Sequence, residues 1–458
     1  MKKYIKEFSI IFLGKLVALA SRLLSLGAGG TWPGEIALRL DKEILKKLVR
    51  EVRYGIILIA GTNGKTTTAK MMEEILKGGY KGDVGNEGKK TVRNESGANL
   101  LNGLVSAFIL KAGWLRKIAV DWAVFEVDEA TLPTALAEFT PKIVVLLNLF
   151  RDQLDRYGEV DLIAEKWLKS LKKLKKETTV ILNADDPQIA HLGKDLSAKV
   201  FYFGLNDPKV FLPELQHATD SIYCLTCQER LTYRGIYFSH LGVWSCPKCG
   251  QKRPMIDLSE WDYPLSGVYN RYNTLAAVLA AKSLGIGDKA IKTALKNFVP
   301  AFGRQEEFKV EGKKVRLLLS KNPTGFNESL RTLKEFPGKK KTLVLVLNDR
   351  IPDGRDVSWI WDVDFEMIPR GTTIIVSGDR AYDMGLRIKY GRLASLPASL
   401  QGGRSGQAGK AKFKIYEKLK EAIDNGLKET NEGETLYILP TYSAMLEARK
   451  IISGRKIL

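Results

Sequence analysis

The stretch Tyr54-Gly-Ile-Ile-Leu-Ile-Ala-Gly-Thr-Asn-Gly-Lys-Thr-Thr67 joins a short apolar run, a glycine-containing loop and the beginning of a helix-forming segment. The run at 54–60 is rich in β-branched residues, which predicts a buried strand, and the helix is expected from Thr66 to Leu76. A strand, a loop and a helix in this order are typical of an α/β nucleotide-binding domain. The fold class expected from this stretch is therefore α/β.

The loop after the apolar run has the composition of a phosphate-binding loop. Its glycines let backbone N–H groups approach phosphate oxygens, Lys65 supplies positive charge for the outer phosphates, and the Thr66 hydroxyl is placed to coordinate Mg²⁺. The alternative is a glycine-rich turn that contains a lysine by chance, which the flanking strand and helix disfavour. The predicted nucleotide-binding residues of the loop are Gly61, Thr62, Asn63, Gly64, Lys65, Thr66 and Thr67.

Apolar runs alternate with helix-forming segments in both halves of the chain, which is typical of parallel, doubly wound sheets. In the first half, strands are expected at Trp122–Val127, Ile143–Asn148 and Thr179–Asn183, with a charged helix at Leu162–Lys176. A second α/β domain is expected after Lys341, with strands at Thr342–Leu347, Thr373–Ser377 and Leu436–Leu439 and helices at Asp379–Lys389 and Ala411–Lys428. The polar, glycine-rich residues Leu396–Lys412 are expected to form a surface loop.

Glu126 stands at the C-terminal end of an expected strand, where ligands bind in open α/β sheets. Carboxylate oxygens there can hold the Mg²⁺ that bridges nucleotide phosphates, so Glu126 joins Thr66 as a predicted magnesium ligand. Asp128 and Glu129 are alternative ligands, and a solvated acidic strand end is the alternative to a metal site. Asn148 and residues 151–155 follow the next strand and are expected to line the same crevice.

Four cysteines form two CxxC pairs at positions 224, 227, 246 and 249. This spacing predicts a structural Zn²⁺ ion held by four thiolates in a small ribbon, with no open position for catalysis. Two disulfides and a redox pair are the alternatives, and a nucleic-acid-binding ribbon is another. The aromatic residues among the cysteines are expected to pack the ribbon rather than bind bases. The predicted zinc ligands are Cys224, Cys227, Cys246 and Cys249.

The chain has 458 residues, and its 72 Lys and Arg residues exceed its 52 Asp and Glu residues by 20. This length indicates two or three domains, and the positive charge favours anionic partners such as nucleotides, nucleic acid or an acidic membrane surface. A disulfide-stapled peptide and a wholly disordered chain are excluded. If all four cysteines bind zinc, no thiol remains to act as a glutaminase nucleophile. Hydrolysis of glutamine would then require another chain.

The N-terminal 30 residues begin with lysines and continue with an apolar stretch that Lys15 and Arg22 interrupt. These charges argue against a signal peptide and against a membrane span, so an amphipathic helix is expected. A cytoplasmic protein is expected because four cysteines leave little material for a disulfide framework. The helix would either cover the flank of the first domain or lie on a membrane surface.

Five motifs resemble those of the Mur ligase superfamily of ATP-dependent amide-bond-forming enzymes, in the same order. They are GTNGKTT at 61–67, LNADDP at 182–187, GVYNRYN at 267–273, FGRQE at 302–306 and KNP at 321–323. Within the superfamily the chain is most similar to MurT-like synthetase subunits of lipid II isoglutaminyl synthase. That similarity depends on the four-cysteine ribbon and on the stretch NDRIPDGRDVSWIWD at 348–362.

The resemblance implies three parts. These are an N-terminal amphipathic helical segment at 1–45, a Mur-ligase-like ATP-binding central domain at 46–302 with the zinc ribbon inserted at 220–255, and a C-terminal Rossmann-like α/β domain at 303–458.

The resemblance also implies the reaction: ATP-dependent amidation of the D-glutamate α-carboxylate of the lipid II stem peptide to D-isoglutamine, through an acyl phosphate. Ammonia would come from a GatD-like glutaminase subunit, and lipid II would be met at the cytoplasmic face of the membrane. The implied cofactors are ATP, Mg²⁺ and structural Zn²⁺, and no nucleic acid partner is expected. Lys65, Glu126 and Asp356 are the expected catalytic residues, and Asn270 and Arg304 are expected to contact the nucleotide.

Asp356 is expected to orient the catalytic histidine of the partner subunit. Asp349 and Asp353 are alternatives for this role, and any of the three could simply form or cap a turn.

Two motifs depart from the pattern of ordinary muramyl ligases. The chain has LSKNP at 319–323 in place of DYAHNP, and DQLD at 152–155 in place of a DHLD-type motif. Loss of the histidine puts a second Mg²⁺ in doubt, because glutamine is a poor ligand for hard cations. Lys166 corresponds either to the carbamylated lysine of many muramyl ligases or to an ordinary solvated lysine. Residues 94–99 either close over the γ-phosphate or only turn the chain.

Two other functions compete with the amidation reaction. The first is a Mur-type or folylpolyglutamate-type ligase that joins an amino acid to a carboxylate. The second is a nucleic-acid-associated NTPase that uses the ribbon as its binding module, which would show steeply salt-dependent binding.

Overall fold

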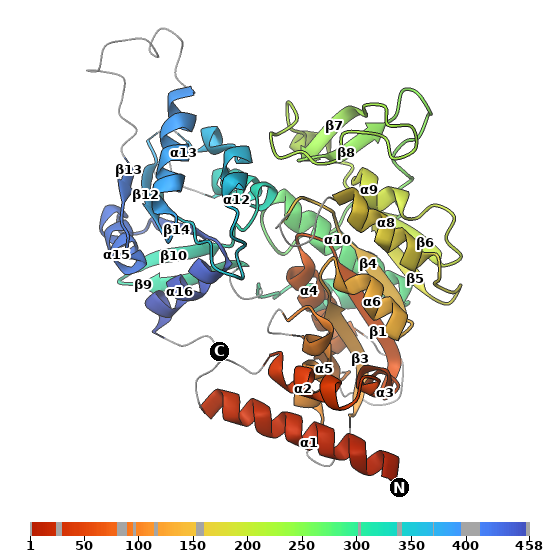
Figure 1. The fold of residues 1–458 in the computed structure, drawn as a ribbon. Coiled ribbons are helices and arrows are strands. Elements are labelled where there is room, and N and C mark those ends of the chain that lie inside the picture. The colour runs from red at the N-terminus through yellow and green to blue at the C-terminus, as the bar shows by residue number, and fades with distance from the viewer. Residues whose placement is uncertain are drawn as a thin grey trace, which may run out of the picture.

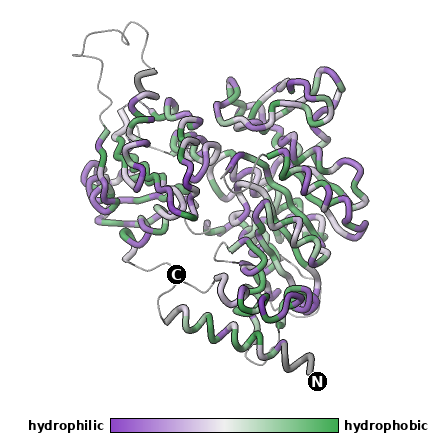
Figure 2. Tube along the Cα trace, viewed as in Figure 1, coloured by the Kyte–Doolittle hydropathy of each residue, from purple (hydrophilic) through white to green (hydrophobic). Residues whose placement is uncertain are grey.

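The computed structural model describes residues 2–23, 30–79, 89–94, 98–113, 118–152, 160–300, 304–336, 341–369, 371–394 and 413–454. Within these residues it contains two six-stranded sheets, each covered by helices, and a separate two-stranded hairpin (Figure 1). Figure 2 shows the hydrophobic residues concentrated along the strands and on the inner sides of the helices.

The first sheet is entirely parallel and has the strand order β2-β3-β1-β4-β5-β6. Its strands are β1 (Val52–Ala60), β2 (Thr91–Arg93), β3 (Val120–Glu126), β4 (Ile143–Leu146), β5 (Thr179–Asn183) and β6 (Lys199–Phe203). The helices around it are α4 (Lys65–Gly79), α5 (Leu101–Lys111), α6 (Thr131–Glu138), α8 (Val160–Leu171), α9 (Pro187–His191), α10 (Val268–Ser283) and α11 (Asp288–Leu295).

Strand β1 is apolar throughout its second half because both of its faces are buried. Leu58 packs into the hydrophobic cluster that includes α5, α6 and α8, whereas Ile57 and Ile59 pack into the opposite cluster with α4, α10 and α11. A central strand of a parallel sheet covered on both sides has this pattern. The expected strand, loop and helix are therefore confirmed, with α4 beginning at Lys65.

The second sheet has the strand order β13-β12-β11-β14-β10-β9 and is parallel except for β9, which pairs antiparallel with β10. Its strands are β9 (Arg304–Val310), β10 (Lys313–Leu318), β11 (Thr342–Val346), β12 (Thr373–Ser377), β13 (Phe413–Ile415) and β14 (Thr435–Pro440). Its helices are α12 (Pro323–Glu335), α13 (Ala381–Ala394), α15 (Leu419–Glu429) and α16 (Tyr442–Ser453), with 3₁₀ turns η2 (Ser358–Asp362) and η3 (Phe365–Met367).

One expected helix is partly wrong. The segment 411–428 contains β13 before α15, because Phe413 and Ile415 pair with β12 at the edge of the sheet. Sheet pairing outweighs the helix preference of the surrounding lysines and alanines. The expected loop at 396–412 lies outside the described residues. The domain boundary at 302/303 also lies outside them and stays a prediction.

The hairpin of β7 (Thr232–Phe238) and β8 (Leu241–Ser245) supports the cysteine region, and a short 3₁₀ turn, η1 (Pro208–Val210), precedes it. Tyr237 is fully buried and Trp244 nearly so, in keeping with the expectation that ribbon aromatics serve packing. Tyr223, by contrast, is 54% exposed.

The N-terminal segment forms α1 (Lys2–Leu23), α2 (Trp32–Leu40) and α3 (Ile44–Val49), and α1 lies along α2 and α5 (Figure 1). Ile10 and Ile11 of α1 are buried in the core of the first domain, which confirms that the helix covers its flank. Among the described residues, no helix combines the length and the apolar content that crossing a bilayer requires.

Candidate active site

The loop between β1 and α4 requires its two glycines. Gly61 and Gly64 have φ angles of +140° and +92°, which other residues rarely adopt. A Cβ atom on Gly64 would lie 2.1 Å from Oδ1 of Asn273. The backbone can therefore pass close to α10 and present the N-terminus of α4 to an anion.

Lys65 is folded back over the loop. Its Nζ donates hydrogen bonds to the carbonyl oxygens of Gly61 and Thr62, and it lies 3.8 Å from Oε2 of Glu129. An ammonium group held against the loop in this way is positioned to meet the phosphates of a nucleotide bound there.

Thr66 and Glu126 meet at the end of β3. The Thr66 hydroxyl donates to Oε2 of Glu126 at 2.5 Å, and Oε1 of Glu126 has no hydrogen-bond partner although the residue is only 2% exposed. A buried, unpaired carboxylate oxygen is costly unless a ligand satisfies it. Carboxylate and hydroxyl oxygens are hard donors that suit Mg²⁺, so this pair fits the ion.

Asn94 fixes the main chain of Glu126. Its side-chain amide donates to the Glu126 carbonyl at 2.8 Å and its Oδ1 accepts from the Glu126 N–H at 3.1 Å. Of the residues at 94–99, Asn94 and Asn99 line the cavity, and Glu95 and Gly97 lie outside the described residues. Asp128 also lines the cavity, and its Oδ1 accepts from the Thr131 N–H at the start of α6 at 2.7 Å.

The C-terminal domain touches the phosphate loop. Asn322 caps α12 and donates to Oδ1 of Asn63 at 3.1 Å, and Lys321 forms an ion pair with Asp152. Asn148 holds the other side of Asn63, accepting from its N–H at 2.8 Å. The KNP motif and the DQLD motif are thus brought together at the loop. Gln153, Leu154 and Asp155 lie outside the described residues.

A cavity of about 750 Å³ opens between the two domains. Its lining from the first domain includes Lys65, Thr66, Glu126 and Asn270, and its lining from the C-terminal domain includes Lys321. Asn270 is 2% exposed and donates to the Ser266 carbonyl at 2.6 Å. The Arg304 side chain lies outside the described atoms. Sequence reasoning assigned no role to three further lining residues: Tyr269 and Gln305 stand inside the motifs at 267–273 and 302–306, and Glu328 lies in none of the motifs.

Lys166 is exposed on α8 and does not line this cavity. Its position favours the alternative of an ordinary solvated lysine.

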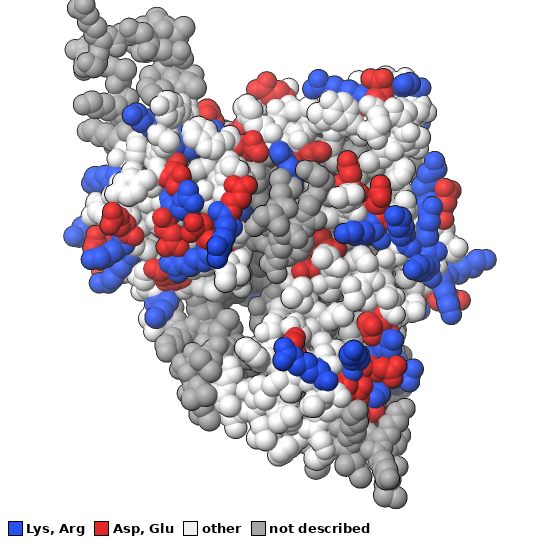
Figure 3. All heavy atoms as spheres, viewed as in Figure 1, with Lys and Arg blue, Asp and Glu red and all other residues white. Residues whose placement is uncertain are grey.

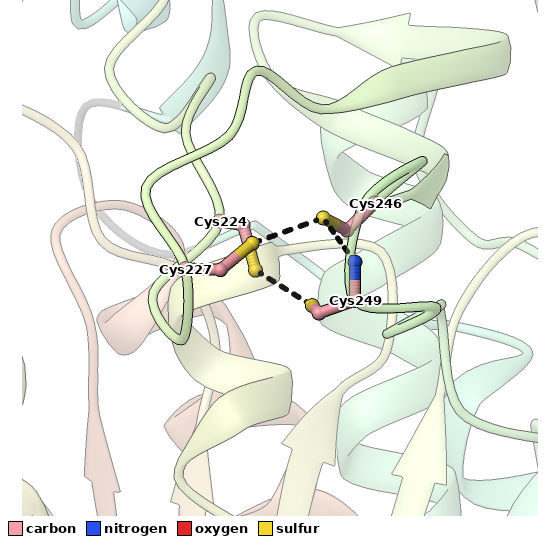
Figure 4. A group of neighbouring side chains, drawn as sticks. All are labelled: Cys224, Cys227, Cys246 and Cys249. Atoms are coloured by element: carbon pink, nitrogen blue, oxygen red, sulfur yellow. Dashed lines mark hydrogen bonds between the residues drawn. The ribbon is translucent and has the colours of Figure 1, made fainter.

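The four cysteines converge (Figure 4). Their sulfur atoms all lie within 4.8 Å of one another and no two are disulfide-bonded, with 3.5 Å between Cys224 and Cys249 and 3.4 Å between Cys227 and Cys246. Tetrahedral thiolates around a metal at about 2.3 Å are separated by similar distances. The cluster can therefore hold a metal ion with four sulfur ligands.

The three aspartates after β11 have different surroundings. Asp353 is buried and accepts from the Ser443 N–H at 2.8 Å, and Asp349 lies 3.3 Å from a guanidinium nitrogen of Arg380. Asp356 is exposed, and its Oδ1 accepts from the Ser358 N–H at 2.8 Å at the start of η2. That hydrogen bond lowers the pKa of Asp356, so its carboxylate is ionised at neutral pH.

The chain matches the family model of the Mur ligase middle domain over residues 59–281 and that of the MurT ligase C-terminal domain over residues 319–445. It is 36% identical to the lipid II isoglutaminyl synthase (glutamine-hydrolyzing) subunit MurT of Staphylococcus aureus, over 84% of this chain and 88% of that relative. The chain belongs to the MurT family. The MurT subunit of Streptococcus pneumoniae is 34% identical over 97% of each chain.

Among solved structures, a pseudomurein peptide ligase type C from Methanothermus fervidus matches with a TM-score of 0.63 and 20% identity, over 89% of this chain and 80% of that one. This likeness shows the Mur ligase fold. The predicted α/β fold, the predicted MurT-like family and the predicted class of ATP-dependent ligase in peptidoglycan synthesis are thus confirmed. The MurT relatives are named as subunits, which supports the expectation of a partner chain.

Proposed function

We propose that this MurT family member is the synthetase subunit of a lipid II isoglutaminyl synthase, which amidates the α-carboxylate of D-glutamate in the lipid II stem peptide. The observation that carries the proposal is the Thr66–Glu126 pair, which faces a cavity closed by the MurT-type C-terminal domain. The names of the relatives supply the substrate and the glutamine-hydrolysing complex.

The proposed reaction has two steps, and the cavity residues have a role in the first. An oxygen of the acceptor carboxylate attacks the γ-phosphorus of ATP and ADP leaves, giving an acyl phosphate. Ammonia then attacks the acyl carbon, phosphate leaves, and a proton is lost to give the amide. The backbone N–H groups of the loop and Lys65 neutralise charge on the phosphates. Mg²⁺, which Thr66 and Glu126 would hold, supplies further charge neutralisation when bound.

Ammonia must come from another chain. All four cysteines belong to the sulfur cluster, so the chain has no other thiol to hydrolyse glutamine. A GatD-like glutaminase subunit supplies it, and Asp356 is the residue that reaches the catalytic histidine of that subunit. Asp356 is exposed and ionised, whereas Asp353 is buried in a contact with Ser443.

The test is amidation of purified lipid II by this chain with ATP and either ammonium or glutamine, and then with glutamine plus the glutaminase subunit. Product with ammonium alone, and with glutamine only after the partner is added, supports the proposal. No amide in any mixture, with ADP formed only when amino acids are offered, would instead indicate the amino-acid ligase.

The sulfur cluster is proposed to hold structural Zn²⁺. Cys224 and Cys246 pack with Trp244 in a small cluster that also contacts Ala190 of α9, so the metal would stabilise the ribbon against the central domain. We expect Cys246→Ser to remove most of the bound zinc and to lower the melting temperature, because the ribbon has little other core. Metal analysis and thermal unfolding check this, with Ser245→Ala as the matched control. Full zinc content in Cys246→Ser would contradict the proposed ligand set.

The exposed side of α1 is proposed to rest on an anionic membrane surface, where the lipid-linked substrate resides. Its large apolar side chains are between 38% and 49% exposed: Phe8, Phe12, Leu13, Leu16 and Leu19. Residues 2–23 contain five Lys or Arg and one Glu, a net charge of +4 that complements anionic lipids. In Figure 3 the described part of α1 presents a mostly uncharged surface, and α5, against which α1 packs, lines the cavity with Leu110 and Lys111.

We expect Leu16→Glu to weaken binding to phosphatidylglycerol vesicles by about tenfold, because an apolar side chain no longer enters the interface. Vesicle flotation measures this, with Leu162→Glu as the control, since Leu162 is 54% exposed on α8 at a different surface. Equal weakening by both variants would contradict the assignment of α1. A change in oligomeric state without a change in flotation would show that α1 meets a second copy instead.

A further inference from the structure

Glu328 is a buried acid in the cavity that the chemistry above does not use. It lies on α12, is 2% exposed and lines the cavity between the domains. Neither of its carboxylate oxygens has a hydrogen-bond partner. Burial raises its pKa to about 7. Leaving both oxygens of a buried carboxylate without donors costs free energy that a bound ligand would recover.

The nearest cation does not satisfy this carboxylate. Arg331 lies 3.8 Å from Oε1 of Glu328, and its guanidinium donates instead to the carbonyl oxygens of Tyr237 and Val210. Glu335, about two turns further along α12, adds negative charge and accepts from the Gly267 N–H at 3.0 Å. The described residues therefore supply no hydrogen-bond donor to either oxygen, and a molecule in the cavity can supply both.

The position along α12 indicates which part of a nucleotide lies near Glu328. Asn322, at the start of α12, contacts Asn63 of the phosphate loop. Glu328 follows six residues later, which places it about 9 Å along the helix from that contact. This separation is comparable to the span from the phosphates of a nucleotide to its sugar.

The neighbours of Glu328 fit the nucleoside end of the same ligand. Tyr269 lines the cavity with it, and burial, together with the charge of Glu328, raises the Tyr269 pKa to about 12. Gln305 donates to the Tyr269 hydroxyl at 2.8 Å, and Asn270 follows Tyr269 on α10. An aromatic ring, two amides and a carboxylate provide a flat surface and acceptors beside the phosphate loop.

We propose that Glu328 binds the vicinal hydroxyl groups of the ATP ribose, with each carboxylate oxygen accepting one O–H hydrogen bond. The proposal rests on the ATP-dependent function proposed above. It names the residue that distinguishes a ribonucleotide from a nucleotide without the two ribose hydroxyl groups. A ribose hydroxyl held by a carboxylate is a recurrent solution in nucleotide-binding folds.

The test compares nucleotide affinity, without turnover, for ATP, 2′,3′-dideoxy-ATP and purine riboside triphosphate. The native protein should bind ATP at least about tenfold more tightly than dideoxy-ATP, because two charge-assisted hydrogen bonds are lost with the hydroxyls. Glu328→Leu should weaken ATP binding by a similar factor and leave dideoxy-ATP binding within about threefold. Glu328→Gln, which keeps the shape and one acceptor, should fall between the two.

Thermal stability separates ligand binding from a structural role. Glu328→Leu should melt at a higher temperature than the native protein without nucleotide, because an unpaired buried carboxylate is removed. Glu335→Gln, on the same helix but bonded to Gly267, should retain the preference for ATP over dideoxy-ATP.

Three outcomes would overturn the proposal. The first is no discrimination between ATP and dideoxy-ATP by the native protein, and the second is equal weakening of both by the Glu328 variants. The third is that the Glu328 variants keep the preference for ATP over dideoxy-ATP but lose a preference for ATP over purine riboside triphosphate. That result would place Glu328 at the amino group of the base. Because binding is measured, failure of amidation would challenge the proposed function without affecting this result.

Discussion

Asp356→Asn is expected to abolish glutamine-dependent amidation and to spare amidation driven by added ammonium. Asparagine caps helices as well as aspartate does, so the contact with the Ser358 N–H and the turn at η2 should persist. Only the negative charge disappears. Replacing the carboxylate that orients a catalytic histidine lowers turnover by about 10⁴-fold in the best-studied triad, and a loss of roughly 10³-fold or more is expected here.

The measurement is the rate of lipid II amidation by the complex with the glutaminase subunit, with glutamine and then with ammonium chloride. Asp349→Asn is the matched control, because Asp349 is the other partly accessible aspartate and is paired with Arg380. If Asp349→Asn loses the glutamine-dependent activity while Asp356→Asn keeps it, Asp349 holds the role. Equal loss of both activities in Asp356→Asn would show that the residue serves the synthetase site or the fold.

Glu126→Gln is expected to lower amidation about 10²-fold to 10³-fold with either nitrogen source, because a metal-linked charge is removed from the phosphoryl-transfer site. The residue should remain in place, since Asn94 holds its backbone on both sides. Thr66 can still donate to the side-chain oxygen of glutamine. The free protein should be at least as stable, because a buried and unpaired carboxylate oxygen is lost.

Amidation and ADP release measured across a Mg²⁺ titration check this prediction. Glu126→Gln should require more Mg²⁺ than the native protein at the same ATP concentration. Asp128→Asn is the control, because the Asp128 carboxylate is bonded to the start of α6. If instead Glu129→Gln shifts the Mg²⁺ requirement and Glu126→Gln does not, the magnesium ligand is Glu129, whose carboxylate lies beside Lys65.

Local rules determined much of the fold and part of the site. The second half of the run at 54–60 is buried on both sides, so its apolar composition was sufficient to predict a buried strand, and the two glycines predicted the loop. The strands at 179–183 and 373–377 were predicted at their observed bounds for the same reason. Two edge strands of the second sheet were missed. Strand β9 is mostly polar and β13 has only three residues, so neither shows the apolar run or the alternation of apolar and polar residues from which a strand is predicted.

The sequence alone determined which residues could carry the chemistry: the four cysteines, the phosphate loop and the acid at the end of β3. Only the tertiary structure decided which of them meet. Asn63 and Asn322 are 259 positions apart and touch because the C-terminal domain closes on the loop. Glu328 has no motif, and its two unpaired oxygens arise from burial between the domains. Burial and pairing depend on neighbours that only the folded chain supplies, so no local pattern could have identified this residue.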